Sequence, residues 1–275
     1  MRLGKPARAQ STPRHAEDHS PVKEPATSSL GPALSLENVT FAYDSEPILE
    51  DITLQLPRGQ FMALVGPNGG GKTTLLKVAL GLLQPPQGHV LLFGQEVARF
   101  HQWHRISYVP QRPSGFESLS PATVLEVVAQ GAYKGPDPLA FLRPQATREV
   151  LWAMKTMGLK DLSQERIAEL SIGQQRRAIL ARALVKRPEA LFLDEPAAGL
   201  DPAAQEALFL HLSQLHKEHG VTILLVSHDL AMVTRYTTVM ACIRRKIIHM
   251  GPPQTLHQEH IAALFGLDHG PVDHL

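Results

Sequence analysis

The sequence has a single cysteine, Cys242, so no internal disulfide can form, and we expect a reducing compartment. It also lacks any apolar run near the ~20 residues that a membrane-spanning helix needs. The start, residues 1–6, has no apolar stretch of the secretory type. The formal net charge is only +1, so no overall field points to nucleic acid or an anionic membrane. If the chain works at a membrane, we expect another subunit to bring it there.

Composition divides the chain into three parts. Residues 1–32 are rich in proline, serine, alanine and charge, and they cannot bury enough apolar area to offset chain entropy. We therefore predict a disordered N-terminal tail over 1–32, a folded domain over 33–251 and a C-terminal tail over 252–275.

Hydrophobic patterning predicts an α/β fold. Alternating segments typical of strands cover 33–41 and 52–56, whereas fully apolar, buried-type runs cover 61–65, 190–193 and 221–226. A hairpin-like segment covers 87–94, helical patterns follow at 72–83 and 202–218, and helices dominate the stretch 113–185. This alternation of strands and helices predicts a mostly parallel sheet covered by helices.

The strongest motif is the glycine-rich loop GPNGGGKT at 66–73, which fits G-x-x-x-x-G-K-[ST] between an expected strand and an expected helix. Glycines let successive backbone N–H groups surround a phosphate, and the following helix directs its positive dipole end at the same place. We expect Lys72 to reach the β- and γ-phosphates of ATP and the Thr73 hydroxyl to bind Mg²⁺. The expected ATP-binding residues here are Gly66, Pro67, Asn68, Gly69, Gly70, Gly71, Lys72, Thr73 and Thr74.

Two further strands end in residues that suit phosphate chemistry. Asp194 and Glu195 follow the apolar run 190–193, where a fold of this kind places a Mg²⁺-ordering aspartate. We expect Asp194 to take that role and Glu195 to orient or deprotonate the attacking water. His228 follows the run 221–226, so it is expected at the same sheet edge, close to the γ-phosphate.

Residues 170–177, LSIGQQRR, resemble the LSGGQ signature of ABC transporter ATPases. Other motifs of that family follow in order, and the resemblance runs from about residue 34 to 250. It implies that Tyr43 stacks on adenine, that Gln111 contacts Mg²⁺ and senses the membrane partner, and that Asp201 lies in the D-loop. Glu195, His228 and Gln111 are then the catalytic residues, and Thr73, Gln111 and Asp194 the magnesium ligands.

The resemblance also implies a fold and a mechanism. The fold is a P-loop NTPase of the ABC type, with a RecA-like parallel-sheet core, a small antiparallel β subdomain and a helical subdomain at about 113–185. In the family, Ser171, Gly173 and Gln174 of one monomer close over ATP held by another, so a homodimer is expected. Ile172 departs from the pattern, because the family usually has glycine there. A β-branched side chain disfavours positive φ and adds bulk.

The transported substance is inferred from weaker resemblances than those of the ATP-binding motifs. The sequence distance between Lys72 and Asp194 leaves no room for a long coiled coil, which argues against the chromosome-maintenance relatives of the family. The single cassette argues against the relatives that act as tandem translation factors. Non-transport ABC ATPases are therefore the less favoured alternative. The stretch around Trp103, together with 121–128, resembles zinc and manganese importer ATPases. This implies a cytoplasmic-face subunit beside integral-membrane permeases, served by a metal-binding periplasmic or lipoprotein receptor. Siderophore or haem import is the alternative. We expect permease docking at 116–126.

The 14 histidines do not by themselves indicate a metal site. His257 and His260 are three apart and would share a helix face, while His269 and His274 lie near the end of the chain. No closed four-ligand spacing is present, so we expect a solvated, histidine-bearing tail.

Overall fold

The computed structural model describes residues 1, 31–111, 121–133 and 144–266. Almost all of the predicted N-terminal tail therefore lies outside the described residues. The same holds for His269, His274 and the first part of the expected docking segment, 116–120.

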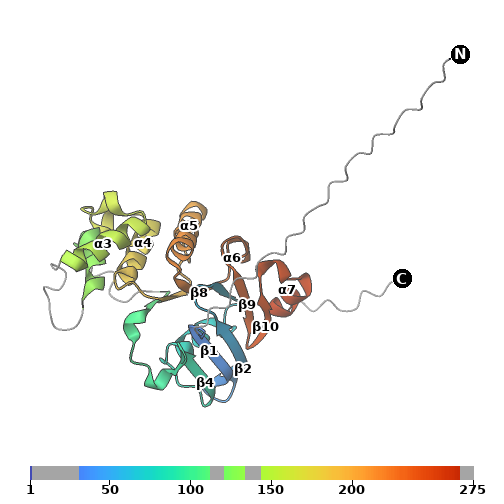
Figure 1. The fold of residues 1–275 in the computed structure, drawn as a ribbon. Coiled ribbons are helices and arrows are strands. Elements are labelled where there is room, and N and C mark those ends of the chain that lie inside the picture. Colours follow the sequence, from blue (N-terminus) through green and yellow to red (C-terminus); the bar gives the residue numbers. More distant parts are fainter. Residues whose placement is uncertain (2–30, 112–120, 134–143, 267–275) are drawn as a thin grey trace, which may run out of the picture.

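A small antiparallel sheet begins the fold (Figure 1). Its strand order is β2-β1-β4-β5, and β1 pairs antiparallel with both β2 and β4. The strands are β1 Leu34–Ala42, β2 Pro47–Leu56, β4 Gln87–Leu92 and β5 Gln95–Glu96. Strand β2 begins before the predicted 52–56, since its first residues pair with the end of β1.

The second sheet is the core, with the strand order β10-β9-β3-β8-β7-β6. All neighbours in it are parallel except β9 and β10, which form an antiparallel edge. The strands are β3 Phe61–Val65, β6 Ile106–Val109, β7 Ala190–Asp194, β8 Thr222–Ser227, β9 Val239–Arg244 and β10 Lys246–Gly251. The predicted parallel sheet is thereby confirmed.

Helices cover the core and build a separate helical subdomain. They are α1 Lys72–Ala79, α2 Val124–Ala129, α3 Pro144–Thr156, α4 Ile172–Leu184, α5 Pro202–His219, α6 Leu230–Tyr236 and α7 Gln258–Phe265. Short 3₁₀ turns lie at Val97–Arg99, Trp103–Arg105, Gln130–Ala132, Lys160–Leu162, Ile167–Glu169 and Pro253–Thr255. Helix α1 ends before the predicted residue 83, because Gly81 takes a φ of +67° just after it.

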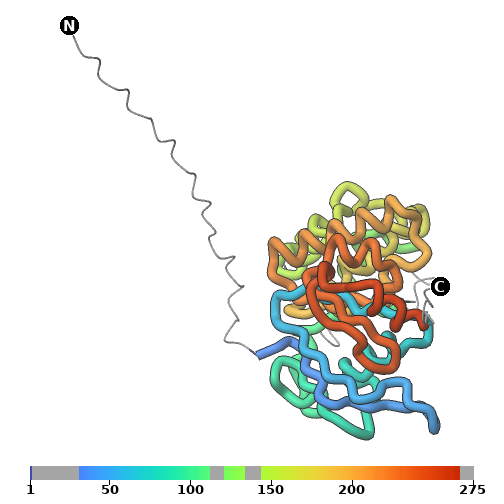
Figure 2. Tube along the Cα trace, turned by 90° about the vertical axis from the view of Figure 1, so that its right-hand side faces the viewer, coloured from blue at the N-terminus to red at the C-terminus, as the bar shows by residue number. Residues whose placement is uncertain are grey.

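The subdomains occupy opposite ends of the molecule. Figure 2 shows the antiparallel sheet at one end and the helices of the helical subdomain at the other, with the core sheet between them. Helices α2, α3 and α4 contact one another, and they fall within the predicted range 113–185. Helix α7 lies in the predicted C-terminal tail but packs on β9 and β10 and buries Leu264.

The core strands are buried on both faces. In β3, Phe61 packs in the cluster shared with the helical subdomain, whereas Met62 and Leu64 pack with α1 and the antiparallel sheet. Such strands fix the loops at their carboxyl ends, where the motifs lie. Cys242 is buried in β9, and burial raises the pKa of its thiol to about 11, which leaves it unreactive. Within the described ranges, no helix combines the length and apolarity that bilayer crossing requires.

Candidate active site

The glycine-rich loop runs from the end of β3 to the start of α1. A Cβ on Gly66 would lie 2.1 Å from the carbonyl oxygen of Ile243, so β9 leaves room there only for glycine. Gly71 has a φ of +95°, and its Cβ would lie 2.9 Å from the carbonyl oxygen of Ile48. The loop is thus shaped by close approach to β9 and β2. Asn68 and Gly69 at its tip are exposed, and Thr74 is buried at the start of α1.

Lys72 closes this loop on itself. Its Nζ donates to the carbonyl oxygens of Gly66 and Pro67, each at 2.9 Å, and the residue is only 5% exposed. Burial lowers the pKa of the ammonium, while the nearby carboxylates of Glu195 and Asp194 act to raise it. A phosphate oxygen at the loop would offer this desolvated ammonium a charged partner in place of neutral carbonyls.

Asp194 and Thr73 meet although they are far apart in sequence. The Thr73 hydroxyl donates to Asp194 Oδ1 at 3.0 Å, and Asp194 is only 3% exposed. Burial raises the pKa of this carboxyl, and the hydrogen bond from Thr73 opposes that shift. A hydroxyl and a carboxylate are hard oxygen donors of the kind that Mg²⁺ prefers. The residues present therefore fit a magnesium ion.

Glu195 stands between two other predicted residues. Gln111 Nε2 donates to Glu195 Oε2 at 2.9 Å, and His228 Nδ1 lies 3.7 Å from Glu195 Oε1. The Glu195 backbone has a φ of +47° and donates its N–H to the Val226 carbonyl on β8. The structure thus assembles the carboxylate, the amide and the imidazole from the ends of three core strands. Among the described residues, the Gln111 side chain makes no hydrogen bond to Thr73 or Asp194.

Sequence reasoning missed Arg176. Its guanidinium donates to the carbonyl oxygen of Gln111 at 2.9 Å, and burial lowers the pKa of the group. It therefore joins the predicted sensor glutamine to α4, the helix that starts at the LSIGQQRR segment. The only available signal in the sequence was its place within that segment.

The LSIGQQRR segment forms the capped start of α4. Gln174 N–H donates to Ser171 Oγ at 3.3 Å, and Ser171 N–H donates to Gln174 Oε1 at 2.9 Å. Gly173 is buried, and a Cβ there would lie 2.8 Å from the Cβ of Ala204. Asp201 caps α5 by accepting from the Ala204 N–H at 3.0 Å. The starts of α4 and α5 therefore abut through Gly173 and Ala204.

The backbone at Ile172 needs no positive φ, so the β-branched side chain causes no conflict there. Ile172 is the first residue of α4 and is not among the described residues with positive φ. Its side chain is instead 61% exposed, so the departure from glycine consists of apolar bulk at the surface. Within the described part of the chain, no hydrogen bond or ion pair joins 171–174 to the loop 66–74.

Tyr43 lies just beyond β1 at the edge of the antiparallel sheet. Its ring packs edge-to-face on Phe41 at 5.1 Å between ring centroids, and the residue is 55% exposed. A face of the ring is thus free to stack on a planar ligand.

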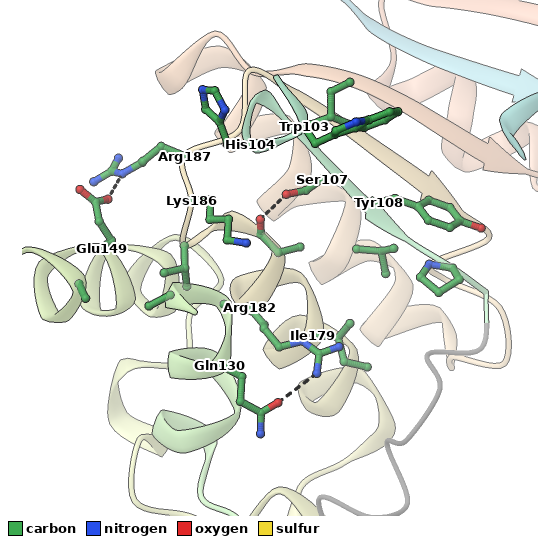
Figure 3. A pocket seen from close by; sticks show the side chains of 18 of the residues that line it. Trp103, His104, Ser107, Tyr108, Gln130, Glu149, Ile179, Arg182, Lys186 and Arg187 are labelled. Carbon is green, nitrogen blue, oxygen red and sulfur yellow. Dashed lines mark hydrogen bonds and ion pairs between the residues drawn. The ribbon is translucent and has the colours of Figure 1, made fainter. Parts of the chain in front are cut away.

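A groove of about 1280 Å³ separates β6 from the helical subdomain (Figure 3). Trp103 and Tyr108 border it on the core side, and Arg182 and Lys186 face it from α4 and the turn beyond. Arg182 is 3.4 Å from the amide oxygen of Gln130, and neither Arg182 nor Lys186 has a carboxylate partner among the described residues. The groove is consequently cationic.

His257 and His260 meet at the start of α7. His257 precedes α7, and its N–H donates to His260 Nδ1 at 3.1 Å, while the His260 N–H donates to the His257 carbonyl oxygen at 3.1 Å. His257 is thus the residue before the helix and not part of it, but its ring stacks on that of His260 with 5.7 Å between the ring centroids, so the two side chains do lie side by side. The described residues contain no group of three or more side chains placed to hold a metal ion.

Comparison with known proteins agrees with this geometry. The ABC transporter family matches residues 49–198. The zinc uptake system ATP-binding protein ZurA of Listeria innocua is 42% identical over 79% of this chain and 85% of its own. The manganese transport system ATP-binding protein MntB of Bacillus subtilis is 37% identical over 81% of this chain and 88% of its own. The structure of cbiO1 from Clostridium perfringens, part of an ABC transporter complex, superimposes with a TM-score of 0.73, with 28% identity, over 86% and 96% of the two chains.

Proposed function

Because the chain belongs to the ABC transporter family, we propose that it is the ATPase subunit that energises uptake of zinc or manganese through a separate permease. It binds and hydrolyses ATP, in keeping with the family and with the assembled loop and carboxylates. The assignment of the transported ion rests on one observation. The zinc and manganese transport proteins reported above match this chain over most of its length, and they are named for the transport of those ions. Siderophore or haem import is the alternative, and neither relative is named for it.

The roles of the site residues follow from their contacts. Lys72 exchanges the Gly66 and Pro67 carbonyls for phosphate oxygens when ATP enters the loop. Thr73 and Asp194, with Gln111, would hold Mg²⁺, which would neutralise charge on the phosphates. Tyr43 offers its exposed ring to adenine.

Glu195 acts on the attacking water. Its carboxylate accepts a hydrogen bond from Gln111 and lies beside His228, so two groups hold it in one orientation. The His228 side chain is mostly exposed, which leaves its other ring nitrogen free to meet a γ-phosphate.

A second copy of this chain completes the site. Ser171, Gly173 and Gln174 are organised at the start of α4 but do not bond to the chain's own phosphate loop. A helix start offers N–H groups and positive potential, so it suits the γ-phosphate held by the partner copy. The exposed Ile172 lies on this surface.

Permease docking at 116–126 stays a prediction, and the cationic groove between β6 and the helical subdomain adds to that docking surface, because Gln130 just beyond α2 also lines the groove. Arg182 and Lys186 favour a partner segment that carries an acidic residue, and Trp103 adds an exposed apolar wall. Arg176 contacts Gln111 next to this groove, so a partner there can influence the catalytic glutamine. Such docking places the chain at the cytoplasmic face of the membrane, with the receptor on the other side.

The test combines transport with assembly. A strain without this gene receives the natural chain, the Glu195→Gln variant or the Glu259→Gln variant, which alters an exposed carboxylate far from the site. We expect the first and third to restore uptake of radioactive zinc or manganese, and Glu195→Gln to abolish it and to form an ATP-dependent dimer on a sizing column. Restored haem-iron uptake without restored zinc or manganese uptake would refute the cargo. A monomeric Glu195→Gln protein in ATP would refute the dimer.

A further inference from the structure

Three neighbouring side chains fasten the start of α4 to different parts of the chain. Gln175 donates to the carbonyl oxygen of Leu170, just before the helix, at 3.1 Å. Arg177 donates to the carbonyl oxygen of Met157, just after α3, at 3.1 Å. Arg176 lies between them in sequence and bonds to Gln111, which follows the core strand β6. The three bonds have different partners, so each can be removed separately.

Gln111 is engaged through both its backbone and its side chain. Its backbone carbonyl accepts from the Arg176 guanidinium at 2.9 Å, while its side-chain Nε2 donates to Glu195 Oε2 at 2.9 Å. Glu195 Oε1 in turn lies 3.7 Å from His228 Nδ1. A single residue thus connects α4 to the carboxylate that acts on the attacking water.

The bond from Arg176 is suited to fix the backbone of Gln111. A hydrogen bond from a charged donor is shorter than one between neutral groups and about twice as strong. Burial lowers the pKa of the Arg176 guanidinium, and no ion pair engages it within the part of the chain that the structure describes. Gln111 is exposed, so it has little packing of its own to hold it in place.

Helix α4 also begins with the segment that is expected to meet the ATP of a partner copy. Ser171 caps the helix, with the Gln174 N–H donating to its Oγ at 3.3 Å, and Arg176 follows within the first two turns. Residues of one helix keep fixed distances from one another. The position of Gln111 is therefore tied, through Arg176, to the position of the helix start.

We propose that Arg176 is a positioning residue for ATP hydrolysis, which keeps the Gln111 side chain on Glu195 by holding the Gln111 carbonyl to α4. The proposal deepens the function proposed above and rests on it, since it requires Glu195 to act on the attacking water. Arg176 acts through Gln111 and not on the nucleotide, so its loss should slow the chemical step without weakening the binding of ATP.

Two substitutions at Arg176 test this on the full chain. In Arg176→Gln, kcat for ATP hydrolysis should fall about tenfold, because a charge-assisted hydrogen bond is lost. The KM for ATP should stay near its natural value, because the phosphate loop is untouched. Arg176→Lys keeps a charged donor and should recover most of the rate. Single turnovers with protein in excess over ATP give rates for variants that are too slow for steady-state assays.

A double-mutant cycle separates positioning from packing. Gln111→Ala removes the side chain that reaches Glu195 but keeps the carbonyl that Arg176 binds. In that background Arg176→Gln should change the rate by less than about twofold, because no amide is left to position. Arg177→Gln is the matched control, since it removes the next arginine of α4, whose bond is to Met157. Its effect on the rate should be the same with and without Gln111→Ala.

Melting temperatures verify that each variant folds, and the ATP-dependent dimer of the Glu195→Gln chain tests the function on which the proposal rests. The proposal is overturned if Arg176→Gln keeps the natural kcat, or if Arg176→Lys is as slow as Arg176→Gln. It is also overturned if the rate losses of Arg176→Gln and Gln111→Ala multiply in the double variant. A natural chain that does not hydrolyse ATP, or a Glu195→Gln chain that stays monomeric in ATP, would instead contradict the proposed function.

Discussion

One added methyl group at Gly173 tests whether the close contact between the start of α4 and the start of α5, beside the expected D-loop, is needed for catalysis. Gly173 is buried against α5, and an alanine Cβ there would lie 2.8 Å from the Cβ of Ala204. Carbon atoms in contact prefer about 3.5 to 4.0 Å, so Gly173→Ala must push the two helix starts apart by about 1 Å. This displacement would move Ser171, which is expected to meet the partner's ATP, and Asp201.

The predicted effect is larger on catalysis than on stability. Overpacking costs about 1 to 3 kcal/mol, and replacing a helical glycine by alanine returns about 1 kcal/mol. The free energy of unfolding should therefore fall by at most about 2 kcal/mol, which corresponds to roughly 4 to 8 °C in melting temperature. A misplacement of about 1 Å at a catalytic element can lower the rate on the order of a hundredfold.

A compensating variant gives the decisive measurement. Ala204→Gly removes the methyl group that the new side chain would strike, so Gly173→Ala with Ala204→Gly should regain most of the ATPase rate. Steady-state ATP hydrolysis and thermal melts are compared for both single variants, the double variant and Ile172→Gly. Ile172 is exposed and makes no such contact, so its variant should keep or raise the activity.

The reasoning fails if Gly173→Ala hydrolyses ATP at the natural rate. It also fails if the double variant is as inactive as Gly173→Ala while both proteins remain folded, because the contact with Ala204 would then not be the cause.

Three other predictions follow from the contacts. Lys72→Ala should abolish measurable ATP binding in an equilibrium titration, and retained affinity would contradict the role given to its ammonium. Gly66→Ala should also abolish ATP binding, because its Cβ would lie 2.1 Å from the Ile243 carbonyl oxygen; unaltered binding would show that the loop does not need that close approach. Burial lowers the pKa of both His211 and His249 below the usual 6.5, so the unfolded chain binds more protons in mildly acidic solution. The free energy of unfolding should be constant above about pH 6.5 and fall as the pH drops toward the lowered values. Urea unfolding between about pH 7.5 and 5.5 measures this, and His211→Gln should reduce the slope.

Much of the fold could be predicted because its signals are local. The apolar runs that became β3, β7 and β8 are continuous, and only strands buried on both faces need such a pattern. Element ends were less predictable. Helix α1 stops at Ala79 because Gly81 turns the chain, and β2 starts at Pro47 because β1 offers partners there.

The sequence by itself determined the phosphate loop and the identity of the two carboxylates, because spacing within one loop or one strand end fixes those positions. Only the tertiary structure decided that Gln111, Glu195 and His228 meet, since the three come from separate strands of one sheet. It also placed Gly173 against Ala204 and Arg176 against Gln111. These are contacts between segments distant in sequence, and their distances depend on how the sheets and the helical subdomain pack together.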